Sequence, residues 1–376
     1  MRMWSKHSRV FCLAGILFFV QLSYSQKDVD SILRIANKQI YENPEEAISL
    51  GTNVLENSKI TIRNKINALL VISTAHSSKR DYEKGSEYIE AINKLIPQVT
   101  NDLQKMNILN RIGAHYQELQ IYDKALEYLD ESLVLIEKYP VQDSVQSFLG
   151  YNSILRGFIY RKQTNCAIAL KYFDNAIAAY LTTIKRKPIM HANLSICYYN
   201  KGNCLLEMND LPQAKSSFLK SIEHAKIDDA ISLIAFGKKG LAETETHNGN
   251  HQVAILLLNE ALSISINVGD LVLNREIYEG LANNYLAIGD YKRYKIYQNK
   301  YVEIKEANKL AERKTINQSL LNLTQARASE IEKMRNYFIP IQVAFILAIV
   351  FILGFLIRAI IGWEKELKKL ENKLKN

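Results

Sequence analysis

The stretch RIGAHYQELQIYDKALEYLDESL, residues 111–133, decides the fold. It opens with a small residue and an aromatic residue three positions apart, which share one helix face. Turn-forming residues follow, and then a small–large–small series spaced by four and three residues lines one face of a second helix. The residues of this pattern are Gly113, Tyr116, Ala125, Leu129 and Ser132. The stretch therefore predicts a helical hairpin whose small residues let the two helices approach closely.

The same pattern recurs along the chain. Equivalent series begin at Gly157, Gly202 and Ala242. The small residue that opens each second helix recurs at Ala47, Gly85, Ala125, Ala169, Ala214, Ala254 and, in degenerate form, Tyr294. A single hairpin cannot bury its apolar face, so neighbouring hairpins must stack. We therefore predict an all-α solenoid of about seven repeats over residues 26–310.

This pattern resembles the tetratricopeptide repeat family, whose period is about 34 residues. The interval here is about 40 residues, which predicts longer helices or loops and leaves stacking of the HEAT or armadillo type as the alternative. The resemblance implies a superhelix whose concave face is lined by the first helices and suits an extended peptide or a partner helix.

The resemblance also assigns candidate partner-binding residues on this concave face. They are Asn110, Gln117, Tyr151, Phe158, Arg161, Tyr199, Asn203, Lys239 and Glu243. The family's lysine–asparagine clamp for a C-terminal carboxylate is incomplete, because Asn203 fits one clamp position but Tyr199 stands where lysine is expected. The alternative for each of these side chains is that it only packs between repeats or faces water.

The N-terminal residues 1–25 predict a secretory signal peptide, with an uncleaved anchor as the alternative. Basic residues precede an apolar run that is too short to span a bilayer comfortably. Beyond it remain Cys166, Cys197 and Cys204, an odd number. Since Cys197 and Cys204 lie too far apart on one helix to pair, we predict buried structural thiols.

The C-terminal part predicts a membrane anchor. Residues 311–338 lack Gly and Pro and predict a helical stalk, either weakly coiled-coil or folded back on the last repeat. Residues 339–361 carry one charge and are long enough to form a transmembrane helix, with Pro340 in its first turn. Residues 362–376 form a short basic tail with a heptad-like apolar seam, which fits either pairing with a second copy or binding to anionic lipid.

The distribution of positive charge predicts the orientation of this anchor. Six Lys and Arg residues lie at or beyond the C-terminal end of residues 339–361, against three in the preceding flank. Because Lys and Arg accumulate on the cytoplasmic side, we expect a cytoplasmic C-terminus. We therefore predict a single-pass inner-membrane protein whose array lies outside the cytoplasm.

The whole layout is similar to the input half of bacterial membrane-bound tetratricopeptide sensor kinases and helix-turn-helix regulators. The sequence after Trp363 carries no phospho-accepting histidine segment, ATP-binding motif or DNA-reading helix. We predict a sensor or adaptor in signal transduction that binds a protein or peptide on the periplasmic side, with homodimerisation through stalk and tail as a possibility. The alternative is a structural scaffold for envelope protein assembly.

The sequence offers no motif for catalysis. It has no phosphate-binding glycine loop, GxSxG elbow or CxxC pair. His247 and His251 flank a predicted turn, so they are not expected to share a helix face. The net charge of +9 is spread thinly. We therefore predict a protein that is not an enzyme, with no metal, cofactor or nucleic-acid partner.

Overall fold

The computed structural model describes residues 29–374 except 59, 187–189 and 267–270. All the elements in this part of the chain are helices, as predicted. The predicted signal peptide lies outside the described residues. The chain divides into two compact units, of which the first runs to Ile316 and the second begins at Asn317.

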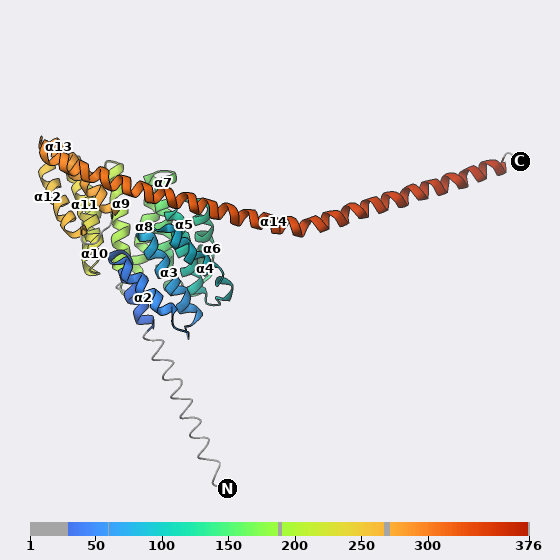
Figure 1. The fold of residues 1–376 in the computed structure, drawn as a ribbon, viewed down its shortest axis with the longest axis horizontal. Coiled ribbons are helices and arrows are strands. Elements are labelled where there is room, and N and C mark those ends of the chain that lie inside the picture. Colours follow the sequence, from blue (N-terminus) through green and yellow to red (C-terminus); the bar gives the residue numbers. More distant parts are fainter. Residues whose placement is uncertain (1–28, 59, 187–189, 267–270, 375–376) are drawn as a thin grey trace, which may run out of the picture. The chain divides into compact units, whose positions relative to one another are not determined.

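Helical hairpins in series build the first unit (Figure 1). A helix over residues 29–42 pairs with α2 (Pro44–Leu55). The following pairs are α3 (Ile62–Ser78) with α4 (Tyr82–Asn93), α5 (Asp102–Glu118) with α6 (Tyr122–Lys138), α7 (Gln142–Gln163) with α8 (Cys166–Thr183), α9 (Met190–Glu207) with α10 (Leu211–Ile227), α11 (Ile231–His247) with α12 (His251–Ser265), and α13 (Leu271–Ala287) with the start of α14 (Tyr291–Leu374). The short 3-10 helix η1 (Ile96–Gln98) precedes α5. The predicted solenoid of about seven repeats is confirmed.

Most hairpins turn in the same way. Two residues after the first helix ends, the backbone adopts the left-handed conformation, with φ between 61° and 77°. The positions are Arg80, Gln120, Asn209, Gly249 and Gly289. The next backbone N–H then reaches back to a carbonyl in the last turn of the helix, as from Asp210 to Leu205 at 2.8 Å. This is the Schellman arrangement, which ends one helix and sets up the next.

The small–large–small series packs as predicted. In the second helices, Ala169, Phe173 and Ala176 are fully buried, as are their equivalents in the neighbouring repeats. A Cβ added at Gly157 would lie 2.4 Å from the Phe173 ring. A Cβ at Gly202 would likewise meet Phe218 at 2.7 Å. The small residues are therefore required for the close approach of the two helices in each hairpin.

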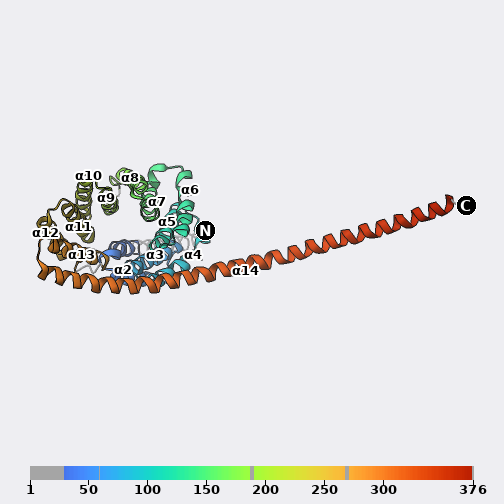
Figure 2. The same ribbon diagram turned by 90° about the horizontal axis from the view of Figure 1, so that it is seen from above.

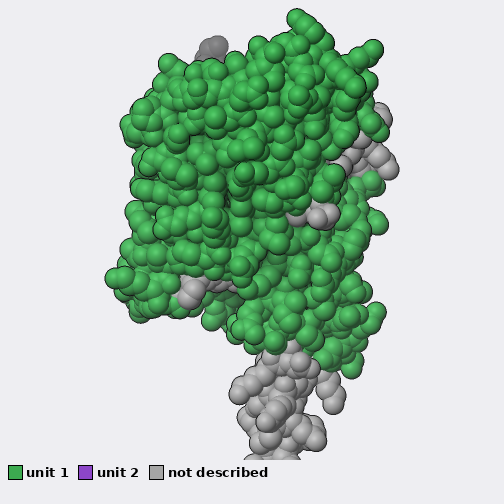
Figure 3. All heavy atoms as spheres, turned by 90° about the vertical axis from the view of Figure 1, so that its left-hand side faces the viewer, with its two compact units in different colours: residues 1–316 green, residues 317–376 purple. Residues whose placement is uncertain are grey.

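The two helices of each hairpin occupy different sides of the array. Figure 2 shows α5, α7, α9 and α11 along the inner side of an arc and α6, α8, α10 and α12 along its outer side. The first helices of successive repeats contact one another directly. On the side of α12 and α13, the space-filling view shows closely packed side chains (Figure 3). The inner helices thus bring side chains from distant parts of the sequence to one face.

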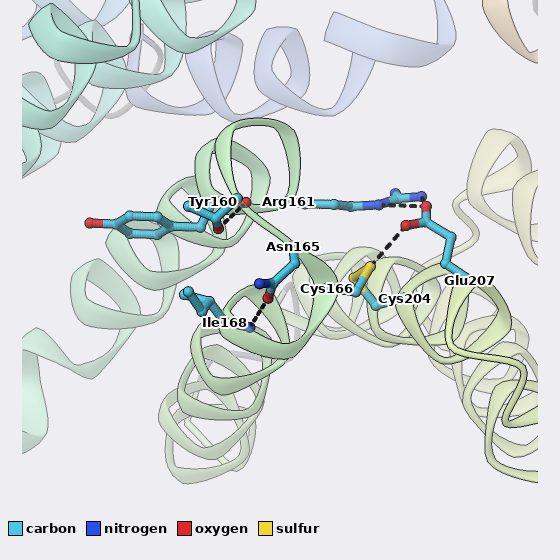
Figure 4. The surroundings of a disulfide bond; sticks show 8 residues. Tyr160, Arg161, Asn165, Cys166, Ile168, Cys204 and Glu207 are labelled. Atoms are coloured by element: carbon cyan, nitrogen blue, oxygen red, sulfur yellow. Dashed lines mark hydrogen bonds and ion pairs between the residues drawn. A yellow bond between two sulfur atoms is a disulfide. The ribbon is translucent and has the colours of Figure 1, made fainter.

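The prediction of reduced cysteines is wrong for two of the three. Cys166 and Cys204 form a disulfide, with 5.0 Å between their Cα atoms (Figure 4). Helices α8 and α9 are antiparallel neighbours, so the start of one meets the end of the other, and this pairing was not considered when the cysteines were counted. Cys197 is free and fully buried, as predicted, and burial raises the pKa of its thiol.

In the second unit α14 continues as an unbroken helix, and the predicted long C-terminal helix is confirmed. Its segment Ile331–Leu370 is the one candidate membrane span among the described residues. The expected position of Pro340 in a first turn is wrong, because the stalk has no helix breaker and α14 continues through Pro340 without interruption. Pro340 has no N–H, so the carbonyl of residue 336 lacks its usual helical partner.

Candidate functional site

All nine candidate residues lie on the first helices of the third to sixth hairpins. The structure engages several of them within the fold. Asn110 is fully buried, donates to the Phe148 carbonyl at 3.0 Å and accepts from the Asn152 amide at 2.9 Å. Phe158 packs against Phe173, with 6.0 Å between ring centroids. Asn110 thus joins two neighbouring repeats, and Phe158 packs inside its own hairpin.

Arg161 lies beside the disulfide rather than free on the inner face. Its guanidinium forms an ion pair with Glu207, and its Nε donates to the Glu207 Oε1 at 3.1 Å. The other carboxylate oxygen of Glu207 lies 3.0 Å from the Cys166 Sγ (Figure 4). Both charges are therefore satisfied locally. Gln117 is half-buried on α5, and its side chain forms no hydrogen bond with another described residue.

Four of the candidates come together in what we call the lysine cluster, on α9, α11 and α13. Its members are Tyr199, Asn203, Lys239 and Glu243, together with Glu276. The Lys239 ammonium is 2.9 Å from each of the two carboxylates and donates to the Tyr199 hydroxyl at 3.2 Å. The side chain of Lys239 is only 7% exposed.

The positive and negative charges of the lysine cluster are paired with one another. The nearby carboxylates and phenol raise the pKa of Lys239 well above its usual value, although desolvation opposes this shift. Arg275 approaches Glu276 to 3.8 Å, so two cations face two carboxylates. The aromatic rings of Phe218 and Phe236 pack against Tyr199. The cluster is thus a satisfied polar network in which the cation is buried and its two carboxylates are partly open to solvent.

A second group, which we call the arginine cluster, gathers at the other end of the inner face. It consists of Tyr41, Arg80, Arg111, Glu118 and Tyr151, contributed by the N-terminal helix, the α3–α4 turn, α5 and α7. Arg111 donates to the Asn37 Oδ1 at 3.3 Å and to the Tyr151 hydroxyl. Its Nε is buried without a partner, and within the described residues no ion pair joins it to an acid.

Tyr41 is the exposed member of the arginine cluster. The side chain has 54% of its surface open to solvent. Nevertheless, desolvation raises the pKa of its phenol. The two observations agree if the ring faces solvent while protein surrounds it on several sides. Desolvation raises the phenol pKa of the half-buried Tyr151 as well.

Glu118 is the acid of the arginine cluster, and its charge is disfavoured. Desolvation raises the pKa of its carboxyl group to about 7, against the opposing effects of Arg80, a hydrogen bond from Ser77, and Arg111. Near neutral pH the group is therefore protonated part of the time and can donate a hydrogen bond. The cluster consequently presents a guanidinium, phenols and a carboxylic acid on one surface.

The N-terminal helix joins this surface to the later repeats. Asn37 contacts Arg111 on α5, and the Glu42 Oε1 accepts from the backbone N–H of Ser232 at the start of α11, at 3.2 Å. The Lys38 charge also acts on Asp228 at the end of α10. These contacts bridge residues far apart in the sequence, so the first hairpin lies close to both halves of the inner face.

Sequence reasoning missed Arg111 and Glu118, which directly follow the predicted Asn110 and Gln117. The positional rule was carried over from a family with a shorter period. A step of one residue turns a side chain by about 100° around the helix axis. The helical spacing of Arg111 and Glu118, seven residues apart on one face of α5, was the signal available in the sequence.

The described histidines do not form a metal centre. Within the described residues, no group of three potential metal ligands converges. His247 ends α11 and His251 begins α12, so the predicted turn between them is confirmed. His191 and His224 approach with 2.9 Å between their Nδ1 atoms, and Tyr198 stacks on His224.

Comparison of sequences identifies one repeat directly. Residues 196–226, which lie on α9 and α10, match the tetratricopeptide repeat family. Comparison with curated proteins gives no match. The matched segment contains Gly202, Ala214 and Phe218, three of the residues on which the repeat pattern was based.

Several solved structures have a similar fold. A Rap protein complexed with competence and sporulation factor aligns with a TM-score of 0.53 and 14% identity, over 74% of this chain and 77% of that chain. NprR in complex with its cognate peptide NprX aligns with a TM-score of 0.52 and 15% identity, over 84% and 94%. A signal transduction ATPase with a tetratricopeptide repeat sensor, from Pyrococcus horikoshii, gives 0.52 and 15%, over 74% and 41%. The array therefore has the tetratricopeptide repeat fold.

Proposed function

We propose that this protein is a membrane-anchored tetratricopeptide repeat protein that binds a peptide, or a segment of a partner protein, on the inner face of its array. The observation that carries the proposal is the arginine cluster, where polar groups from four separate elements converge around Arg111, whose buried Nε has no partner. The similarity to a fold seen in complex with a peptide supports the same class of ligand.

The proposed binding face comprises the arginine cluster with Gln117, and continues toward the exposed edges of the lysine cluster. Asn110, Phe158 and Arg161 are assigned to packing or to internal ion pairs, because their side chains already have partners. This divides the sequence-derived candidates into residues that build the face and residues that remain open to a ligand.

Peptide binding is tested with the purified full chain in detergent. A photoreactive amino acid replaces Tyr41, and the variant is irradiated with a mixture of random octapeptides. We expect crosslinked peptide at position 41 but not at Tyr291, a tyrosine that is 69% exposed at the start of α14. Equal labelling at both positions, or none at either, contradicts binding on the inner face.

We place the array outside the cytoplasm and the C-terminus inside. Three observations support this placement: the predicted signal peptide, the excess of positive charge after residues 339–361, and the Cys166–Cys204 disulfide, since disulfides persist in oxidising compartments. A role as a sensor or adaptor then requires that the predicted transmembrane helix transmit the binding event to the cytoplasmic side. The similarity in layout to the input half of membrane-bound sensor kinases supports that role.

Orientation is tested by labelling introduced cysteines with a membrane-impermeant maleimide. Among the described residues Cys197 is the one free thiol and is buried, so the background is low. We expect Asn248→Cys, in the exposed α11–α12 turn, to react in intact spheroplasts, and Asn372→Cys to react only after permeabilisation. The reverse pattern rejects the proposed topology. Deleting residues 363–376 then separates an adaptor, which loses its output, from a scaffold, which keeps working if inserted.

A further inference from the structure

The two ends of the inner face differ in how their cations are paired. In the lysine cluster, Lys239 and Arg275 face Glu243 and Glu276. In the arginine cluster, Arg111 has only neutral partners, the Asn37 amide and the Tyr151 hydroxyl, and one of its donors is buried without any partner. A guanidinium carries five donors in a planar fork, so a large part of its hydrogen-bonding capacity is unused here.

We propose that the arginine cluster binds a carboxylate group of the peptide ligand, which docks on the Arg111 guanidinium between Tyr41 and Tyr151. This inference rests on the proposed function, since it specifies the chemistry of the same site. Arg–carboxylate pairs are frequently bidentate, which supplies both energy and orientation. The neighbouring phenols offer further donors to the same anion.

Glu118, the acid of the arginine cluster, favours a ligand carboxylate over a more highly charged anion. Glu118 lies close enough to Arg111 for their charges to interact, but the two do not form an ion pair within the described residues. When Glu118 is protonated, its hydroxyl can donate to an incoming carboxylate. A phosphate dianion would place two negative charges beside the same group and would repel its ionised form more strongly.

The negative charge of a ligand carboxylate would also offset the net positive charge of the arginine cluster. Arg111 contributes a full positive charge, and the partly protonated Glu118 offsets only part of it. The side chains that face Glu118 are Ser77, Arg80, Arg111, Tyr41 and Tyr151, of which only the arginines carry charge near neutral pH. One carboxylate therefore brings the site close to neutrality.

The experiment uses the full chain in detergent and an octapeptide mixture prepared in two isotope-coded forms, one with a free C-terminal acid and one with a C-terminal amide. Peptides retained by the protein are counted by mass spectrometry. For the wild-type chain we expect either an excess of about tenfold for the acid form, or a similar enrichment of peptides containing Asp or Glu in both forms. The first result identifies the terminal carboxylate as the group bound, and the second identifies a side-chain carboxylate.

Two variants of Arg111 and one matched control complete the test. Arg111→Met is expected to abolish the preference for carboxylates while the chain still retains peptide, and Arg111→Lys to restore part of it, because the charge returns without the planar fork. Arg161→Met is the control, since this arginine is already paired with Glu207 and its loss should leave the preference unchanged. Thermal unfolding of each variant verifies folding.

The outcomes separate this inference from the function on which it rests. If the wild-type chain retains peptides with no preference for carboxylates, or if Arg111→Met keeps the preference, the carboxylate site is wrong and peptide binding stands. If the wild-type chain retains no peptide in either form, both are overturned. A loss of preference in Arg161→Met equal to that in Arg111→Met also rejects the assignment to Arg111.

Discussion

The lysine cluster and the arginine cluster lie on the same inner face but show opposite electrostatics. Lys239 is almost fully buried and has two carboxylates at 2.9 Å, whereas Arg111 has a buried donor without a partner and no paired acid among the described residues. The comparison shows that polar groups on one surface can have two different roles. A satisfied network fixes the stacking of repeats, and an unsatisfied one remains available to a ligand.

The variant with the largest expected effect removes Lys239, the buried cation of the lysine cluster. We expect Lys239→Met to lower the free energy of unfolding by about 3–5 kcal/mol, because it removes the buried cation that pairs with two carboxylates and leaves these two like charges close together. Urea unfolding of the detergent-solubilised chain measures the loss. The double variant Lys239→Met with Glu243→Gln should recover part of it. A single-variant loss below about 1 kcal/mol would show that the cluster does not hold the repeats together.

The disulfide offers a second test, because it joins the repeat that carries Tyr151 to the repeat that carries Tyr199. It closes a loop with a sequence separation of 38 residues. Chain entropy for such a loop predicts a loss of about 4 kcal/mol in Cys166→Ser with Cys204→Ser. We also expect the two halves of the array to unfold in separate steps, as repeat proteins do when an interface weakens.

The matched control for the disulfide is Cys197→Ala, which leaves the bond intact. It removes a buried thiol and should cost about 1 kcal/mol or less, with a single unfolding transition preserved. A reducing agent should reproduce the double serine variant in the wild-type chain and leave that variant unchanged. If reduction has no effect on either transition, the disulfide does not couple the two halves of the inner face.

The two clusters also differ in their response to pH through Glu118. Its pKa is raised from 4.5 to about 7 on folding, so the folded state binds the proton more tightly than the unfolded state. The stability of the wild-type chain should therefore fall between pH 4.5 and about 7 and then level off. The full shift corresponds to about 3 kcal/mol, which solvent at the half-buried carboxyl reduces to roughly 1–2.

We therefore expect Glu118→Gln to stabilise the chain at pH 8 and to have almost no effect below pH 4.5. Thermal unfolding across this range measures the difference from the wild-type chain. Glu90→Gln is a suitable control, because this acid is exposed and forms only a surface ion pair with Lys94. Stabilisation by Glu118→Gln that is the same at pH 4 and pH 8 would contradict an ionisation effect.

The two clusters also show which features of the structure could be predicted from the sequence. The hairpins follow from short-range patterns, since a small residue such as Gly157 must face an aromatic such as Phe173 wherever two helices touch. Four members of the lysine cluster, Tyr199, Asn203, Lys239 and Glu243, were singled out by the positional rule of the family as partner-binding residues, but their pairing with one another was not predicted. The positional rule works here because it needs only the place of each residue on the first helix of its own repeat.

The arginine cluster and the disulfide could not be predicted in the same way. Arg111 gains its significance from Tyr151, on the next repeat, and from Tyr41, on the first hairpin, and no spacing in the sequence indicates that these three side chains meet. The pairing of Cys166 with Cys204 depends on which ends of α8 and α9 meet. Periodicity specifies which residues are buried, whereas curvature determines which surfaces from distant repeats face each other.

The smallest effect on stability is expected for a variant of the arginine cluster, and it tests the difference between the two clusters most directly. Arg111→Met removes two hydrogen bonds to neutral groups and also removes a buried donor that has no partner. These effects nearly cancel, so we expect a change in the free energy of unfolding within about 1 kcal/mol, against 3–5 kcal/mol for Lys239→Met. Both variants replace an inner-face cation with the same side chain, so urea unfolding compares them directly. A large loss in Arg111→Met would mean that this guanidinium also holds repeats together, and that the arginine cluster is a structural network like the other one.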